Sequence, residues 1–260
     1  MFRIKYLALL VSLIYLFSGC VLPAASSRAN ARLAGRSRQI RTVALLPLEI
    51  KVYQIDAGGV HEEIATWSEQ ARENVITLVE TELRAKMNAA VTIVNAESLA
   101  EERPILQETR ALYSAVSTMI LLHTYPNPNF AGYFFEEKLR NFDYSLGSDV
   151  GDLASGADAL LLLDAEDHIW TGGRQALQAL GVILGIGAAV VTRVVIIPQL
   201  AGGTTVRAAL VDSRTGDILW INTIGAGGGR DLRDAASTKE WISQMFNDFP
   251  TSHDGAPKEK

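Results

Sequence analysis

The sequence predicts an α/β protein with a single domain, in which a mixed β-sheet is covered by helices. Short apolar segments with the length of buried strands alternate with segments of helical periodicity. Their order is strand, helix, strand, helices, strand, hairpin and helix. A long apolar segment is inserted before the final hairpin, and we expect it to be helical.

In the first half of the domain, periodicity separates the strands from the helices. Apolar runs of strand length end at Pro47 or at polar residues, and Ala71 and Val75 belong to a stripe at helical spacing. The predicted elements are a strand at 41–48, a helix at 62–87, a strand at 90–94, and helices at 105–123 and 132–141.

The second half predicts three strands and a closing helix. The first strand is apolar without interruption at its start, which is typical of a strand buried in the centre of a sheet. Gly216 stands where a hairpin turn needs a positive φ. Ser237 and Glu240 have the spacing of a capping box at the start of the last helix. The elements are strands at 156–169, 204–212 and 217–222, and a helix at 237–249.

The first twenty residues, MFRIKYLALLVSLIYLFSGC, have the pattern of an export signal. Two basic residues precede an apolar run that is too short to span a bilayer comfortably as a helix. Ser18 and Gly19 then precede Cys20, the one cysteine of the chain. This arrangement resembles a bacterial lipoprotein signal at residues 1–19, which implies cleavage before Cys20 and acylation of its thiol. Phe17 stands where the family prefers leucine, and an ordinary signal anchor is the alternative.

The segment 20–40 carries several arginines and no acidic residue. We expect it to be a tether that holds the domain, 41–250, off the membrane, and we expect the tail, 251–260, to be flexible. Val21 is not the aspartate that commonly retains lipoproteins at the inner membrane, so the resemblance implies the outer membrane. The net charge of −5 argues against nucleic acid as a partner, because phosphate binding requires a basic surface.

Three stretches carry a further resemblance. VALLPL at 43–48 with a long helix after it, GADALLLLDAED at 156–167 and VRAALVDSRTGDILW at 206–220 resemble the curli-secretion channel lipoproteins and the related N-terminal domain of TolB. The resemblance covers most of the chain after the signal in the order of its elements. It implies self-association or an accessory role in a secretion system.

One set of side chains could form a catalytic or metal-binding site. Asp164, Glu166 and His168 alternate along a predicted strand, so they project from one face and could hold a divalent metal or act as acid and base. The simpler interpretation is that the strand leaves the core here and becomes polar, because no further His or Cys is placed to complete a ligand set. Hydrolase and phosphate-loop motifs are absent from the sequence. We expect no enzyme activity, no metal and no cofactor, and a periplasmic enzyme or metal-binding protein using this face is the alternative.

The apolar segment 179–191, ALGVILGIGAAVV, contains no polar side chain. In the curli channel this interval forms part of a membrane barrel, but barrel strands alternate apolar and polar residues. As a helix the segment would be about 20 Å long, which is short for a bilayer crossing. Gly181, Gly185 and Ala189 lie four residues apart and predict a face that another element can approach closely. We expect a helix buried in the domain or against a neighbouring subunit; a membrane-dipping element and a barrel hairpin are the alternatives.

Taken together, these patterns predict a lipid-anchored periplasmic protein that acts without catalysis, by binding and assembly in envelope biogenesis or secretion. Its expected partners are the membrane, through the lipid on Cys20, and either another protein or further copies of the same chain.

Overall fold

The computed structural model describes residues 27–56, 58–87, 89–125, 136–170, 203–227 and 230–251. The predicted signal with Cys20, the packing face of Gly181, Gly185 and Ala189, and residues 252–260 lie outside these ranges. Within them, no helix combines the length and the hydropathy that a membrane crossing requires.

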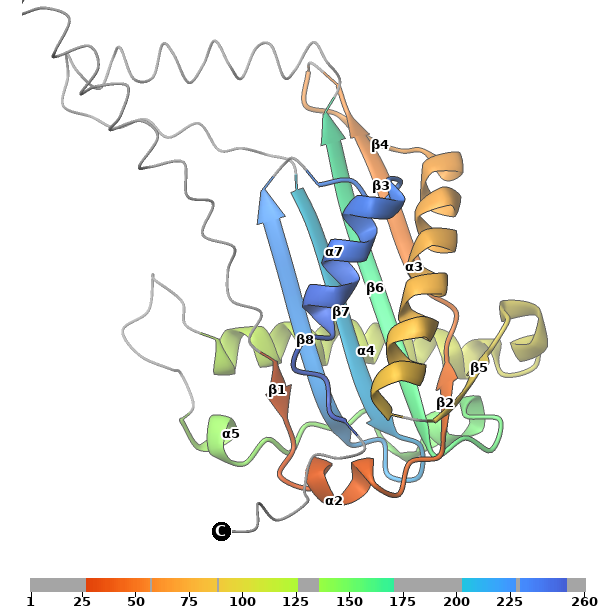
Figure 1. Cartoon of the computed structure of the whole chain (residues 1–260), viewed down its shortest axis with the longest axis vertical. Coiled ribbons are helices and arrows are strands. Elements are labelled where there is room, and N and C mark those ends of the chain that lie inside the picture. The colour runs from red at the N-terminus through yellow and green to blue at the C-terminus, as the bar shows by residue number, and fades with distance from the viewer. Residues whose placement is uncertain are drawn as a thin grey trace, which may run out of the picture.

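Eight strands in the described part of the chain form one mixed sheet, which confirms the predicted fold class (Figure 1). The central path is β1-β8-β7-β6-β2-β5, in which β2 is parallel to β5 and β6, and β6, β7 and β8 are antiparallel neighbours. β3 continues along β6 beyond the end of β2, and β4 pairs with β3. The strands are β1 (Arg28–Ala29), β2 (Thr42–Leu45), β3 (Glu49–Ile55), β4 (His61–Glu63), β5 (Ala90–Ile93), β6 (Ala159–Trp170), β7 (Gly203–Asp212) and β8 (Ile218–Gly227).

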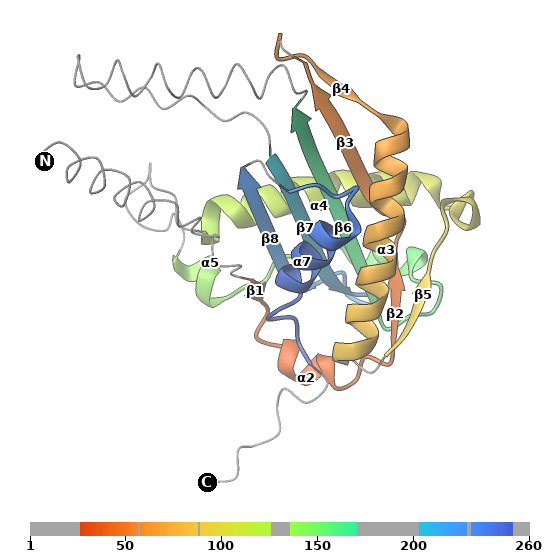
Figure 2. The ribbon, with the colours of Figure 1, turned by 45° about the horizontal axis from the view of Figure 1, so that its top comes forward.

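Helices cover both faces of the sheet, and Figure 1 and Figure 2 show α3 and α7 on one face and α4 crossing the other. The ends of β3 and β6 extend past α4. Among the described elements, a helix therefore covers this part of the sheet on one face and not on the other. The helices are α2 (Leu33–Ser37), α3 (Ala65–Met87), α4 (Arg103–Thr124), α5 (Glu136–Arg140) and α7 (Ala235–Met245), with 3-10 turns η1 (Ala96–Leu99) and η2 (Ser148–Leu153).

The two layers create two apolar cores, and β6 contributes to both. Leu161 and Leu163 belong to the core beneath α3 and α7, whereas Leu160 and Leu162 belong to the core beneath α4. The uninterrupted apolar start of this strand is therefore buried on both faces, as predicted for a central strand.

The predicted helix at 62–87 begins later than expected, at Ala65, because residues 61–63 form the short strand β4. All three residues of β4 are exposed, so their sequence gives no periodic signal. The hairpin that folds β4 back onto β3 is stabilised by Asp56, whose side chain accepts a hydrogen bond from the amide of Val60 at 2.9 Å. Gly59 supplies a positive φ of 86° in the same turn.

The closing helix also differs at its start. Asp234 caps α7, because its Oδ1 accepts a hydrogen bond from the amide of Ser237 at 2.7 Å. The capping box predicted at Ser237 is wrong, since the hydroxyl of Ser237 accepts from the amide of Asp231 at 3.0 Å. Trp241 and Met245 of the predicted apolar face are buried on α7, but the helix ends at Met245 and not at the predicted residue 249, so Phe249 is buried beyond the helix.

The structure places part of the expected tether in the folded domain. β1 pairs with the outer edge of β8, and the amide of Asn30 donates to the carbonyl of Leu219 at 2.9 Å. Arg36 in α2 forms an ion pair with the nearly buried Asp212, with an N–O distance of 2.6 Å. These contacts place the start of the described fold at Ser27, ahead of the expected boundary at residue 41.

Gly216 has a positive φ of 72° in the predicted turn between β7 and β8, and an added Cβ would overlap the carbonyl oxygen of Gly147. We expect Gly216→Ala to lower the free energy of unfolding by roughly 3 kcal/mol, because both the backbone conformation and the overlap are unfavourable. Urea unfolding measures the change. Gly35→Ala is the matched control, since nothing lies within 4 Å of its added Cβ and no stability loss is expected there; equal effects of the two changes would contradict the prediction.

Candidate functional site

On β6, Asp164 lies beside Tyr113 of α4, and Glu166 and His168 follow it toward the end of the strand. They follow Leu160 and Leu162 on the same face of the strand, because side chains alternate. Glu166 is exposed, whereas Asp164 and His168 are partly buried. The three residues therefore share a face, but their environments differ.

Asp164 is bound to Arg207, its direct neighbour on β7. The guanidinium donates from Nε and Nη2 to Oδ2 at 3.0 and 2.6 Å, and both side chains are mostly buried. Burial raises the pKa of Asp164, and the ion pair with Arg207 opposes that effect. The neighbouring phenol of Tyr113 is buried, and its pKa is raised well above the usual value by burial and by the charge of Asp164. The carboxylate of Asp164 is therefore one member of a mostly buried ion pair within the domain.

His168 lies in an aromatic contact at the far end of β3 and β6. Its ring stacks on Tyr53, with the ring centroids 4.9 Å apart, and meets His61 edge-on at 5.0 Å. Nε2 of His168 lies 3.7 Å from a carboxylate oxygen of Glu166. Across the described part of the chain, no three His, Cys, Asp or Glu side chains are placed to hold a metal ion. The expectation that this face binds no metal stays a prediction.

A groove of about 590 Å³ lies beside this face, at the carboxyl ends of the parallel strands β2 and β5. In open α/β sheets the crevice outside such strand ends is a common place for ligands. The groove contains charges of both signs, and its apolar side chains include Ile76 of α3 and Ile93 of β5. A smaller cavity of about 180 Å³ over Asp164 shares Glu49, Lys51 and Arg110 with it.

The groove has the features of a binding surface. Arg110 donates to the carbonyl of Pro47 at 2.8 Å and lies 3.9 Å from Glu49, so its charge is partly neutralised. Arg72 of α3 forms an ion pair with Glu69. Among the described residues that line it, none is a serine, threonine, cysteine or histidine. The arrangement can hold a polar or extended ligand through hydrogen bonds and apolar contacts.

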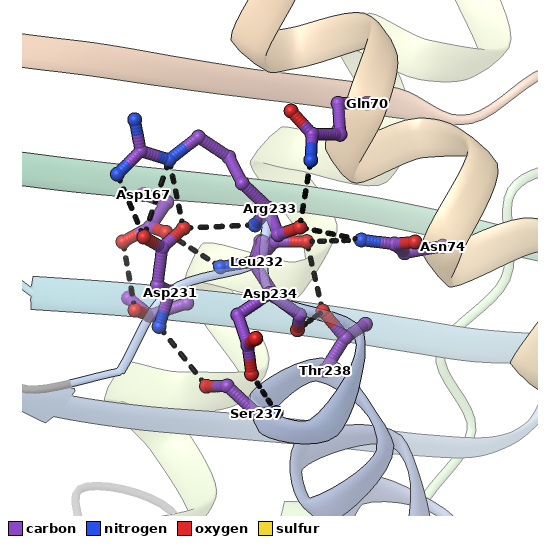
Figure 3. Close-up of polar contacts among 10 residues, drawn as sticks. Gln70, Asn74, Asp167, Asp231, Leu232, Arg233, Asp234, Ser237 and Thr238 are labelled. Carbon is purple, nitrogen blue, oxygen red and sulfur yellow. Dashed lines mark hydrogen bonds and ion pairs between the residues drawn. The ribbon is translucent and has the colours of Figure 1, made fainter.

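Asp167 is the centre of a buried polar network in the described part of the chain, and the sequence analysis did not single it out. The side chain is 1% exposed and points to the opposite face from Asp164. Its Oδ1 accepts from the hydroxyl of Thr204 at 2.8 Å, and its Oδ2 accepts from the amide of Leu232 at 2.9 Å (Figure 3). Burial raises the pKa of Asp167, although both hydrogen bonds act to lower it.

The loop at 230–234 is held from several sides around this carboxylate (Figure 3). Asn74 of α3 donates to the carbonyls of Leu232 and Arg233 at 3.1 and 2.9 Å, and Thr238 of α7 donates to the carbonyl of Leu232 at 2.8 Å. Arg233 binds Asp231 through two nitrogens and covers the ring of Trp67 at 4.0 Å. The loop therefore joins β6, α3 and α7, and it buries Leu232 completely.

Comparison with known proteins gives no relative by sequence, since no family model and no curated protein matches the chain. Solved structures with a similar arrangement include the PelC dodecamer from Paraburkholderia phytofirmans, with 14% identity, a TM-score of 0.35, and coverage of 85% of this chain and 93% of that one. The lipoprotein GNA1162 from Neisseria meningitidis has 10% identity, a TM-score of 0.29, and coverage of 80% and 95%. The C-terminal domain of LpoB from Salmonella enterica has 12% identity, a TM-score of 0.25, and coverage of 77% and 96%.

These structures include one described as a lipoprotein and one described as a dodecamer. With TM-scores this low, the likeness carries no argument about function. The resemblance to the curli-secretion channel lipoproteins stays a prediction.

Proposed function

We propose that the protein is a lipid-anchored component of the bacterial cell envelope, attached to the outer membrane through Cys20 and facing the periplasm, that acts without catalysis by assembling with protein. The short basic region, the apolar run and the two small residues before Cys20 support the anchor. Envelope biogenesis or secretion is the process that fits such a location. The face of Gly181, Gly185 and Ala189 is proposed as a further packing surface.

The proposal that the protein assembles with other proteins rests on the outer face of α4. Leu112, Met119 and Leu122 are 39%, 46% and 46% exposed. No charged residue occurs from position 111 to 122, although one side of this stretch faces away from the sheet. The buried side of α4 contains Leu106, Tyr113 and Ile120 together with Thr109, Ser117 and Thr124, so apolar side chains lie on both sides of the helix.

An ordinary surface helix has its charged side chains outside and its largest apolar side chains inside. α4 exposes leucine and methionine over three turns, and Leu112, Met119 and Leu122 follow the spacing that apolar contact positions have in paired helices. Contiguous exposed apolar surface of this kind marks protein interaction sites. We infer that a protein surface covers this face of α4 in the working assembly.

Met119→Lys is expected to break this assembly, because it places a charge in the centre of the apolar face. The measurement is the sedimentation of the full chain extracted from membranes in mild detergent. Wild type is expected to sediment above the monomer, and the variant is expected to shift toward it with unchanged thermal unfolding. Gln107→Lys, at an exposed position of the same helix outside the uncharged stretch, is the control and should sediment as wild type. A wild type that sediments as a monomer would contradict the proposal.

The anchor has a separate test. Cys20→Ala is expected to abolish incorporation of a labelled fatty acid, because Cys20 is the single thiol of the chain. The unprocessed variant would keep its signal and run at a higher mass on a gel. Wild-type protein that takes up no labelled fatty acid would exclude the lipoprotein assignment.

A further inference from the structure

Four exposed residues of α4 lie on the side of the helix that points away from the sheet, spaced three, four and three positions apart. They are Leu112, Ala115, Met119 and Leu122, and we call them the α4 seam. This spacing is that of the a and d positions of a heptad, at which two paired helices meet. Tyr113, Ser117 and Ile120, which lie on the opposite side, are buried. The seam is therefore the outermost line of the helix, and a second helix has free access to it.

The occupant of the seam has to be uncharged over a similar length, because a charge buried against it would meet no opposite charge. The uncharged stretch of α4, 111–122, is about 18 Å long as a helix. The other two helices of more than ten residues in the described ranges, α3 and α7, expose charged side chains such as Glu73 and Lys239. Among these helices, α4 itself presents the surface that the seam requires.

Two copies of the seam fit each other when the helices run in opposite directions. Reversal pairs each a position with a d position, so Leu112 faces Leu122 of the second copy and Ala115 faces Met119 of the second copy. A small side chain then meets a large one in the middle layers, and leucine meets leucine in the outer layers. The centre of this pairing is position 117, and the centre of the uncharged stretch lies between positions 116 and 117. The two uncharged stretches therefore cover each other along nearly their whole length.

A parallel pairing of the same seam is less favourable. It would place Met119 against Met119 of the second copy and Ala115 against Ala115, which fills the layers unevenly. It would also align the two helix dipoles in the same direction and place Glu108 and Arg110 beside like charges. The antiparallel arrangement avoids these three costs.

We propose that α4 packs against α4 of a second copy of this chain, antiparallel, about a two-fold axis that passes between Ala115 and Met119. The proposal rests on the proposed assembly role and names the partner of that surface. Because the same residues contribute from both sides, this contact closes at two copies, and a larger assembly would use another surface.

Cysteine cross-linking tests the direction and the register of this pairing. Full-length Leu112→Cys and Leu122→Cys are produced together with different C-terminal tags and treated in membranes with a thiol reagent that reaches about 8 Å, the distance between paired helix axes. A cross-linked species that contains both tags is expected. Either variant alone should give at least about tenfold less product, because its two thiols would lie about 15 Å apart along the pair.

Wild type and one further variant control this experiment. Wild type, whose single thiol is that of Cys20, should give no product. Gln107→Cys places a thiol at an exposed position of α4 outside the seam, and with Leu122→Cys it should also give at least about tenfold less product than the seam pair. The inference is overturned if either seam variant alone gives as much product as the mixture, which would indicate parallel pairing.

It is also overturned if the mixture gives no product. A shift of the sedimentation by Met119→Lys in that case would show that a different protein covers the seam, so the assembly proposal would stand while self-pairing fails. If wild type sediments as a monomer, both fail together.

An exchange of charge gives a second measurement that needs no thiol. Ala115→Glu alone, like Met119→Lys alone, is expected to shift the sedimentation of the full chain to the monomer. Produced together, the two variants are expected to sediment as the pair again, because the new carboxylate of one chain faces the new ammonium of the other. A mixture that stays monomeric would exclude the proposed register.

Discussion

Asp167→Ala is expected to lower the free energy of unfolding by roughly 3 kcal/mol, because it leaves the amide of Leu232 and the hydroxyl of Thr204 without an acceptor in the core. Urea unfolding of the purified protein measures the loss. Amide exchange should accelerate most in the loop at 230–234 and at the start of α7, since Asp167 joins them to β6. A loss of stability without this local increase would contradict the assigned role.

Asp167→Asn is the control for charge, because it keeps the shape and one acceptor. Burial raises the pKa of Asp167 above its unfolded value of about 3.9. The stability linked to this proton is fully present below the unfolded pKa and is lost as the pH rises through the folded pKa. Wild type should therefore gain stability relative to Asp167→Asn when the pH is lowered from neutral toward 4. A difference between the two proteins that is the same at every pH would contradict the raised pKa.

Arg207→Met is the second change with a large expected effect, again a loss of roughly 3 kcal/mol. The substitution keeps a side chain of similar length and removes the cation, so Asp164 stays mostly buried without its partner. Removing one member of a buried ion pair costs more than removing both, because the remaining charge is uncompensated. Thermal and urea unfolding measure the effect.

The double variant Asp164→Leu with Arg207→Met tests this explanation. It removes both charges, and we expect it to recover much of the stability that the single change loses. If the double variant is as unstable as Arg207→Met alone, the packing of the arginine stem, and not its charge, stabilises this site.

The sequence was most informative where periodic apolar residues occur. The uninterrupted apolar start of β6 predicted a central strand, and the structure buries it between two helical layers. Gly216 predicted the hairpin turn for the same local reason that the structure shows, a positive φ. β1 and β4 could not be predicted, because two or three residues with little burial form a strand only where a neighbouring edge is available.

The candidate site was predictable in its residues but not in their partners. Alternation placed Asp164, Glu166 and His168 on one face. The ion pair between Asp164 and Arg207, however, depends on the register of β6 and β7, which the sequence pattern does not give. Asp167 gave no signal, since a single acidic residue near the end of a strand usually faces solvent. Its two donors lie 37 and 65 positions further along the chain, and the fold alone brings them to it.

The pairing of β1 with β8 would limit how far the domain extends from a membrane if Cys20 carries the proposed lipid. Ser27 is fixed to the domain through Asp248, with an O–O distance of 2.7 Å, and it lies seven positions after Cys20. Fully extended, this length reaches about 25 Å. A lipid on Cys20 would therefore hold the first strand of the domain within about this distance of the membrane surface. A partner protein would have to be present in the same layer to bind the domain.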